Sequence, residues 1–343
     1  MRKPAALRPG DRVAAVSLSW GGPGSFPHRY QAGKRQLEET FGVQVIESRH
    51  ALAQPEWLAS HPEARAADLM EAFADPSIQA IVSTIGGDDS IRLLPFLDLA
   101  VIRANPKVFL GYSDTTVTHF ACLKAGLVSF YGPSIMAGFG ENGGLFDYMI
   151  SSVRKTLFRA EPIGRIAPNA NGWTTEVLDW ANPELQSQKR KLRPCQGWRW
   201  LQGGGRHRGR LIGGCLDVVD WLRGTPVWPD QSEWSDVILF LEISEEAAGP
   251  RTVVHFFRAL AASGALDGVR GVLFGRPYGE EADGDAYDEA VRQVFRERGQ
   301  DEAPIITDMD FGHTDPMFVI PYGLEAEIDC EKKTFSILES AVT

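Results

Sequence analysis

Cysteine is scarce in this sequence of 343 residues, and its four copies are widely scattered, at Cys122, Cys195, Cys215 and Cys330. The absence of a Cys-x-x-Cys pair and of a dense cysteine framework excludes a small disulfide-stapled scaffold and favours a reducing, cytoplasmic setting. His-Glu-x-x-His and other close pairs of His or Cys are missing as well, so the sequence predicts no metal ion and no cofactor. Asp88-Asp89 offers adjacent oxygen ligands that could contact a cation, which is a weak indication.

Long apolar runs and excess positive charge are also absent. No segment reaches the roughly 18 apolar residues needed to cross a bilayer, and Pro4, Arg8 and Asp11 interrupt the stretch after Arg2 and Lys3. We therefore expect neither a membrane span nor a signal peptide. The net charge of -10 argues against binding nucleic acid polymers through their phosphates, which requires clustered Lys and Arg. Two short basic runs are predicted to be solvated loop surface, namely Lys189-Arg190-Lys191 and Arg206-His207-Arg208.

The residues that are present are typical of a globular α/β protein with two domains. Apolar residues make up 43% and charged residues 23%, near the averages for globular proteins, and 343 residues exceed one ordinary domain. Over residues 1–163, short β-branched runs alternate with helical patterns, which predicts a parallel sheet with crossover helices. The expected strands are Arg12 to Ser17, Val43 to Glu47, Ala80 to Thr84, Lys107 to Leu110 and Leu127 to Tyr131, and the expected helices are Gln31 to Thr40, Pro62 to Ala74 and Thr115 to Lys124.

The remainder of the chain divides into a linker and a second α/β domain. Residues 164–205 are rich in Pro, Asn, Gln and basic residues and end in three glycines, which is typical of an interdomain linker. Residues 206–343 are expected to form the second, smaller domain. Its predicted strands are Val237 to Ile243, Val269 to Phe274 and Pro304 to Thr307, followed by a β-hairpin of Gly323 to Asp329 and Thr334 to Leu338.

Ser113 lies in the run Gly111-Tyr112-Ser113-Asp114, between an apolar strand and a helix. Ligands of open α/β sheets bind outside the carboxyl ends of the strands, so this loop is a place for function. A sharp turn that presents a serine here resembles a nucleophile elbow, although Thr115 stands where the usual Gly-x-Ser-x-Gly pattern has its last glycine. Serine or aspartate before a helix is also an ordinary N-cap, so the run alone leaves both interpretations open.

A glycine turn, Gly86-Gly87, follows the neighbouring predicted strand. Acyl transfer needs backbone N–H donors close to the developing oxyanion, and glycine permits that close approach. If this turn lies beside the serine, the N–H groups of Gly87 and Asp114 could form an oxyanion hole. A tight strand-to-helix connection with no ligand explains the same two glycines equally well.

A serine nucleophile needs a base to remove its proton, and the base needs an acid to orient it. Among the seven histidines, His313 lies in a loop bounded by glycine and proline after a predicted strand, where functional residues collect. Glu242 belongs to an apolar strand, and a carboxylate buried there requires a partner. His313 and Glu242 are therefore the candidate base and acid, with a structural salt bridge as the alternative role for Glu242.

The linker carries four tryptophans, Trp173, Trp180, Trp198 and Trp200, which is unusual for a passive tether. They either pack the linker against a domain or line a binding cleft.

Together these motifs resemble the LD-carboxypeptidase serine peptidases, and more closely their MccF-like branch, named for the microcin C immunity carboxypeptidase. The resemblance covers essentially the whole chain and rests on the order Gly86-Gly87-Asp88-Asp89-Ser90, Gly111-Tyr112-Ser113-Asp114, Gly197-Trp198-Arg199-Trp200-Leu201-Gln202-Gly203, Gly209-Arg210-Leu211-Ile212-Gly213-Gly214, Leu241-Glu242 and Gly312-His313-Thr314-Asp315-Pro316. It implies a serine-type carboxypeptidase with the triad Ser113, Glu242 and His313, and an oxyanion hole at the backbone of Gly87 and Asp114. It also implies a flavodoxin-like N-terminal domain, a smaller C-terminal α/β domain and a homodimer.

The resemblance further implies a small-molecule substrate. MccF-like enzymes cleave the amide-type bond between an amino acid and a nucleotide, as in processed microcin C or aminoacyl sulfamoyl adenosines. Other members remove the terminal D-alanine of a muropeptide during murein recycling. The Gly-Gly-Asp-Asp-Ser loop and the Trp-rich linker resemble the MccF-like branch. The candidate substrate contacts are Asp88 and the indoles of Trp180, Trp198 and Trp200, which are suited to stacking on adenine.

Two functions of other classes stay open at this point. A non-catalytic α/β protein could hold a nucleotide or muropeptide without cutting it. A cysteine-dependent amidotransferase-like enzyme would need a cysteine at the elbow, where this chain has Ser113, and ranks last. The choice between an aminoacyl nucleotide and a muropeptide depends on pocket geometry that motifs do not encode.

Overall fold

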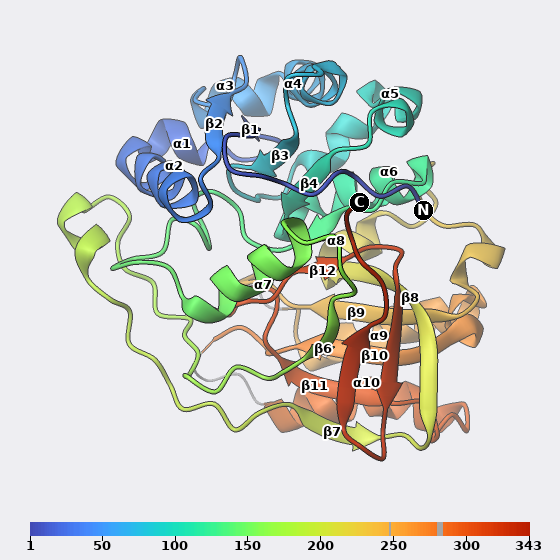
Figure 1. Cartoon of the computed structure of the whole chain (residues 1–343). Coiled ribbons are helices and arrows are strands. Elements are labelled where there is room, and N and C mark those ends of the chain that lie inside the picture. The colour runs from blue at the N-terminus through green and yellow to red at the C-terminus, as the bar shows by residue number, and fades with distance from the viewer. Residues whose placement is uncertain (247, 280–283) are drawn as a thin grey trace.

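Two β-sheets with helices packed beside them organise the molecule (Figure 1). The computed structural model describes residues 1–246, 248–279 and 284–343. The N-terminal half of the chain forms the upper part of the molecule in Figure 1, and the second sheet lies below it. Both termini lie where the two parts meet, and the N–H of Ala6 donates a hydrogen bond of 2.9 Å to the carbonyl of Thr343.

The first sheet has the strand order β12-β5-β4-β3-β1-β2, and the five strands from the N-terminal half run parallel. This 2-1-3-4-5 order confirms the predicted flavodoxin-like domain. The central strands β3 and β4 are buried along their whole length, as expected of parallel strands covered on both faces. The five parallel strands are β1 (Arg12–Val16), β2 (Gln44–Glu47), β3 (Ala80–Ser83), β4 (Val108–Gly111) and β5 (Phe130–Tyr131).

The helices of this half follow the predicted alternation closely, and α4 has the bounds that the sequence predicts. Helix α2 begins four residues before the predicted Gln31, because Pro27 occupies its first position, and it ends where Gly42 adopts a left-handed conformation. Among the described residues, no helix has the length and apolar character needed to span a bilayer. The helices are α1 (Gly22–Ser25), α2 (Pro27–Phe41), α3 (Pro55–Ser60), α4 (Pro62–Ala74), α5 (Leu99–Ala104), α6 (Thr116–Ala125) and α7 (Asp147–Leu157).

The second sheet has the order β6-β14-β13-β8-β9-β10-β11-β7, with a parallel centre of β8, β9, β10 and β11. The predicted hairpin is present as the antiparallel pair of β13 and β14. The strands are β8 (Arg206–Cys215), β9 (Val237–Glu242), β10 (Val269–Gly275), β11 (Ile305–Met309), β13 (Glu325–Asp329) and β14 (Thr334–Ile337). The helices of this half are α8 (Leu216–Trp221), α9 (Pro250–Ala262) and α10 (Gly284–Glu297).

Residues 164–205, the expected linker, contribute a strand at each end. Strand β6 (Gly164–Ile166) pairs with β14, and β7 (Arg199–Gln202) pairs with β11, so the segment borders the second sheet at both edges. The basic run that follows is not a loop, as the sequence analysis expected, because it begins β8. Arg206 and Arg208 point to solvent there and form ion pairs of 2.8 Å with Asp329 and Glu327 of the neighbouring β13.

One short strand connects the two sheets. Strand β12 (Ile320–Pro321) comes after β11 in the chain, yet it pairs antiparallel with β5 at the edge of the first sheet. The segment between β11 and β12, which contains His313, is therefore held by the second sheet at its start and by the first sheet at its end. This crossing brings a residue of the C-terminal half to the strand ends of the N-terminal half.

Candidate active site

Ser113 occupies a strained turn between β4 and α6. Its φ is +63°, a left-handed conformation that costs a residue with a side chain about 1 kcal/mol or more. The close packing of Gly111 explains the sharpness of the turn, because a Cβ there would lie 2.9 Å from Thr115 Oγ1. Such strain at a strand-to-helix turn is the conformation of a nucleophile elbow, and it presents the serine hydroxyl at the carboxyl end of the parallel strands.

The glycine turn lies directly beside this serine. A Cβ at Gly86 would lie 2.9 Å from Ser113 Oγ and 3.5 Å from the backbone nitrogen of Asp114. Gly87 has φ of +143°, and a Cβ there would lie 2.3 Å from Ser19 Oγ, so only glycine fits this approach. Asp114 belongs to the first turn of a 3₁₀ helix (Ser113–Thr115), where N–H groups have no partner within the helix. The structure thus places Gly86 against Ser113 and the backbone nitrogen of Asp114, and Gly87 lines the same cavity as Ser113.

The side chain of Asp114 holds the two turns together, a role that the sequence analysis did not foresee. Its Oδ2 accepts hydrogen bonds from the N–H groups of Asp89 (3.1 Å) and Ser90 (2.8 Å). Ser90 Oγ donates in return to the carbonyl of Asp114 at 2.7 Å. Burial raises the pKa of the Asp114 carboxyl, and the hydrogen bonds from Ser19, Ser90 and Asp89 oppose that rise. These hydrogen bonds join the loop of Asp89 and Ser90 to the loop of Asp114, which gives a structural reason for the polar side chains at these positions.

His313 and Glu242 complete a hydrogen-bonded chain to Ser113. The Ser113 hydroxyl lies 3.0 Å from His313 Nε2, and His313 Nδ1 lies 2.6 Å from Glu242 Oε2. Glu242 ends β9 and is fully buried, while His313 follows β11 and is 8% exposed. Gly312 permits this contact, since a Cβ there would lie 2.5 Å from the Glu242 carboxylate. The three predicted residues therefore meet at one point, although 129 and 71 residues separate them in the sequence.

The carboxylates around His313 favour its protonated form. Burial alone would lower the pKa of the imidazole, but Glu242 and then Glu245 and Asp315 outweigh burial and raise the pKa above its ordinary value. Glu245 Oε2 lies 3.4 Å from His313 Nε2, the nitrogen that faces Ser113. An imidazolium formed during proton transfer is thus stabilised from both sides of the ring.

Tyr131 is a further polar neighbour that the sequence analysis missed. Its hydroxyl donates to Glu242 Oε1 at 2.5 Å and accepts from the N–H of Ser113 at 3.1 Å. One signal for it was present, because Tyr131 ends a predicted strand and β-pairing places it beside Gly111 at the same sheet edge. The hydroxyl links the acid to the backbone of the elbow.

A cavity of about 590 Å³ opens above Ser113 and His313. Two of the predicted substrate contacts, Asp88 and Trp180, line it. Trp198 and Trp200 are not among its lining residues: the Trp198 indole N–H donates to Asp310 Oδ2 at 2.7 Å, and Trp200 pairs with Ile306 in the second sheet. We therefore do not propose these two indoles as substrate contacts. Their packing holds residues 164–205 against the second sheet.

Arg29 and Trp180 form one flank of the cavity. The Arg29 guanidinium lies 4.7 Å from the Trp180 ring centroid and donates to the carbonyl of Met136 at 2.9 Å and to Gln186 at 3.2 Å. Burial lowers the pKa of Arg29 to about 10, so the group stays cationic at neutral pH. This flank combines an aromatic surface with a positive charge, which suits a base and an adjacent anionic group.

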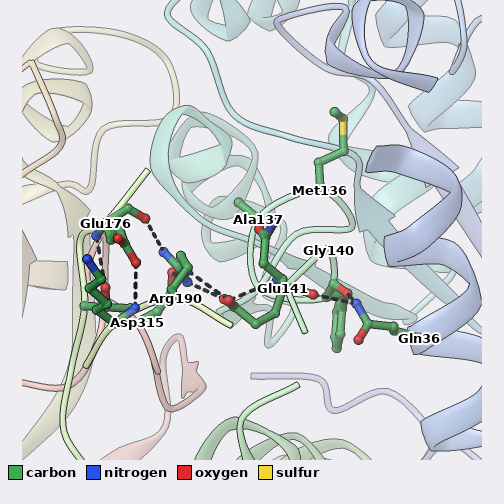
Figure 2. Close-up of polar contacts among 12 residues, drawn as sticks. Gln36, Met136, Ala137, Gly140, Glu141, Glu176, Arg190 and Asp315 are labelled. Carbon is green, nitrogen blue, oxygen red and sulfur yellow. Dashed lines mark hydrogen bonds and ion pairs between the residues drawn. The ribbon is translucent and has the colours of Figure 1, made fainter. Parts of the chain in front are cut away.

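Arg190 forms an ion-pair network that supports the His313 loop (Figure 2). The basic run around it was expected to be solvated loop, and for Arg190 this is wrong, because its side chain is 11% exposed. It forms ion pairs with Glu141 and with Asp315, the latter at 2.7 Å, and donates to the carbonyl of Glu176 at 3.2 Å. Asp315 lies two residues after His313, so Arg190 ties the His313 loop to the N-terminal domain and to residues 164–205.

A serine on a strand-to-helix turn, bonded to a histidine that a buried carboxylate orients, is the arrangement of serine hydrolases. The chain belongs to the LD-carboxypeptidase family, whose N-terminal domain matches residues 13–132 and whose C-terminal domain matches residues 208–328. It is a serine-type carboxypeptidase with an MccF-like fold.

Proteins of known name and structure align with nearly the whole chain. The Microcin C7 self-immunity protein MccF of Escherichia coli is 30% identical over 98% of this chain and 95% of its own length. An MccF-like protein from Streptococcus pneumoniae, solved in complex with AMP, has a TM-score of 0.86 and 30% identity, covering 96% of this chain and 98% of that one. MccF in complex with aspartyl sulfamoyl adenosine has a TM-score of 0.86 and 28% identity, with both chains covered completely.

Proposed function

We propose that this carboxypeptidase hydrolyses the amide-type bond of aminoacyl-nucleotide compounds, with Ser113, His313 and Glu242 as its triad. The observation that carries the proposal is the chain of hydrogen bonds from Glu242 through His313 to Ser113 at the floor of one cavity. The wall of that cavity joins Trp180 to a buried cationic Arg29. Related structures contain AMP and an aminoacyl sulfamoyl adenosine, which are ligands of this chemistry.

The proposed mechanism is acyl transfer in two steps. His313 Nε2 takes the Ser113 proton as Oγ attacks the acyl carbon, and the carbon–nitrogen bond breaks when His313 returns that proton to the leaving nitrogen. Water then attacks the acyl-enzyme ester with His313 again as the base, which releases the amino acid and regenerates the serine. Glu242 fixes the imidazole tautomer, and the N–H groups of Gly87 and Asp114 stabilise the oxyanion in both steps.

The nucleotide portion is proposed to occupy the Trp180 flank. An indole stacks on any base, and such stacking contributes about 1 to 3 kcal/mol per base. Asp88, which lines the same cavity, is a candidate hydrogen-bond acceptor for the nucleotide. The amino acid then extends to the opposite side of Ser113. We retain a cytoplasmic homodimer as part of the proposal, and sedimentation measurements on the purified chain test the dimer directly.

Hydrolysis of two substrates by the same preparation tests the function. We expect release of free amino acid from an aminoacyl sulfamoyl adenosine and no release of D-alanine from an L,D-linked muropeptide tetrapeptide. Ser113→Ala should reduce turnover by at least about a thousandfold, given the scale of triad knockouts, while circular dichroism stays unchanged. Cleavage of the muropeptide alone would instead identify a murein-recycling carboxypeptidase. Binding of both compounds without a product would contradict the proposed hydrolysis.

A further inference from the structure

The cavity above Ser113 carries far more negative than positive charge. Its lining includes two guanidinium groups, Arg29 and Arg190, and six carboxylates, Asp88, Glu176, Asp217, Glu245, Glu246 and Asp315. Arg190 is already neutralised, because it forms ion pairs with Glu141 and Asp315. Arg29 lies against the Trp180 ring. Of the other acidic groups, Glu245 pairs with His313, and Asp88, Glu176, Asp217 and Glu246 form no ion pair within residues 1–246, 248–279 and 284–343.

Three of these carboxylates form one group beside the triad, which we call the acidic flank: Asp217, Glu245 and Glu246. Asp217 lies in the first turn of α8, and Glu245 and Glu246 follow β9, the strand that ends in Glu242. Asp217 and Glu246 have no ion pair or hydrogen-bond partner within residues 1–246, 248–279 and 284–343. In the same described residues, Glu245 has His313 as its one ion-pair partner, and its side chain is 62% exposed.

The hydroxyl of Tyr112 provides an independent sign of a ligand in the same place. Tyr112 is 8% exposed, lines the cavity and packs its ring 5.0 Å from that of His313. Its hydroxyl has no hydrogen-bond partner in the described part of the chain. The Tyr112 side chain is more than nine-tenths buried while its unpaired hydroxyl stays accessible at the cavity that the residue lines, so a molecule bound there can supply the partner. The oxygen can accept a hydrogen bond from an N–H donor, and the ring face attracts cations.

We infer that the acidic flank selects substrates whose acyl portion carries a positive charge, such as a lysyl or ornithyl side chain. The inference rests on the proposed function, since it assigns the Trp180 flank to the nucleotide and leaves the acidic flank to the amino acid. An ammonium group near Asp217 and Glu246 replaces its water shell with two carboxylates and the Tyr112 oxygen. An anionic acyl side chain in the same position meets like charges in a partly desolvated site, which is unfavourable.

The test compares three sulfamoyl adenosines that differ only in the acyl side chain: lysyl, norleucyl and glutamyl. Norleucine matches the lysine carbon chain without its charge. We expect kcat/KM for the lysyl compound to exceed that for the norleucyl compound about tenfold and that for the glutamyl compound about a hundredfold, in line with one to two unit charges at 4 to 6 Å. Equal values for the three compounds, or a preference for glutamyl, overturn the inference.

Variants assign the preference to the acidic flank. The double variant Asp217→Asn/Glu246→Gln should reduce the lysyl-to-glutamyl ratio at least tenfold while the norleucyl rate changes little. Glu176→Gln is the matched control, because Glu176 lines the same cavity beside Arg190 (Figure 2), and its amide oxygen can still accept from the N–H of Lys191. It should leave the ratio unchanged. An unchanged ratio in the double variant contradicts the assignment.

Binding separates failure of this inference from failure of the proposed function. Calorimetry with the Ser113→Ala variant measures the affinity for the same three compounds without any hydrolysis. Tighter binding of the lysyl compound, with no cleavage of any compound by the unmodified enzyme, supports the charge selection and rejects the proposed reaction. Equal affinities for the three compounds, together with normal cleavage, reject the charge selection and support the reaction.

Discussion

The hydroxyl of Tyr131 donates a hydrogen bond of 2.5 Å to Glu242 while it accepts one from the N–H of Ser113. The acid of the proposed triad and the backbone of the nucleophile therefore share one side chain. Tyr131 is fully within the core and belongs to β5, which pairs with β4 on one side and with β12 on the other. The position of the carboxylate is thus fixed by the same sheet that forms the elbow.

Tyr131→Phe should reduce kcat/KM about tenfold to a hundredfold with little change in fold. The change removes one hydrogen bond to a charged group, worth about 1.5 to 3 kcal/mol, and the ring keeps its packing. Glu242 loses a donor and becomes a stronger partner for the imidazolium, so the acidic limb of the pH profile should move to higher pH. Steady-state kinetics across pH measure both effects. An unchanged rate and profile would show that the hydroxyl has only a packing role.

Activity should fall as the pH drops through the pKa of His313. His313 can accept the serine proton only while its imidazole is neutral. The neighbouring carboxylates raise its pKa above the ordinary value of 6.5, so the loss of kcat/KM should begin at a pH above 6.5 as the pH is lowered. Glu245→Gln removes a neighbouring negative charge, lowers the pKa and should move the acidic limb to lower pH. Glu246→Gln is the control for charge removal nearby. A limb at the same pH in the Glu245 variant would argue against this electrostatic coupling.

Trp180→Ala should raise the KM for an aminoacyl sulfamoyl adenosine about tenfold to a hundredfold, with a smaller effect on kcat. The expected loss is the stacking energy of one base on an indole, about 1 to 3 kcal/mol. Trp198→Phe is the contrasting variant, because it removes the donor to Asp310 within the packed second sheet. It should lower the melting temperature and leave KM unchanged. The reverse pattern would place the nucleotide elsewhere.

Arg190→Met should lower the free energy of unfolding by about 3 to 5 kcal/mol, since it leaves the carboxylates of Glu141 and Asp315 without their cation in a buried position. Arg190→Lys keeps the charge but cannot reproduce all three contacts, so a smaller loss is expected. Urea denaturation of the two variants and the parent measures the difference. Equal stability of the Met variant and the parent would show that solvent replaces the ion pairs without cost.

Much of the first domain could be predicted from the sequence because each strand there is short, apolar and followed by a helix. The pattern located β1, β3 and α4 to within a residue or two. Strand β8 was not predicted, and its first half gives no apolar signal, because Arg206 and Arg208 are balanced by partners on another strand. The two-residue β12 contains Pro321 and depends wholly on its pairing with β5.

The candidate site could be predicted in part for similar reasons. Ser113, Glu242 and His313 each follow or lie in a predicted strand, so the local sequence marked them as candidates, and the order of the family motifs joined them in a triad. Tyr131 also ends a predicted strand, but its role, like that of Asp217, depends on which side chains lie across the sheet edge or the cavity. Trp198 and Trp200 showed the opposite error, since indoles in a polar segment suggest a binding surface but here they anchor the segment.

The pairing of β12 with β5 also determines how the protein can be divided. An N-terminal fragment that ends within residues 164–205 would retain the elbow but lose the strand that completes its sheet edge, and with it the histidine and the glutamate. A C-terminal fragment would in turn expose β12 without a partner. Each half therefore needs the other to complete its structure. Proteolytic cleavage within residues 164–205 should leave two fragments that stay associated and active. Either fragment alone should be inactive and prone to aggregate.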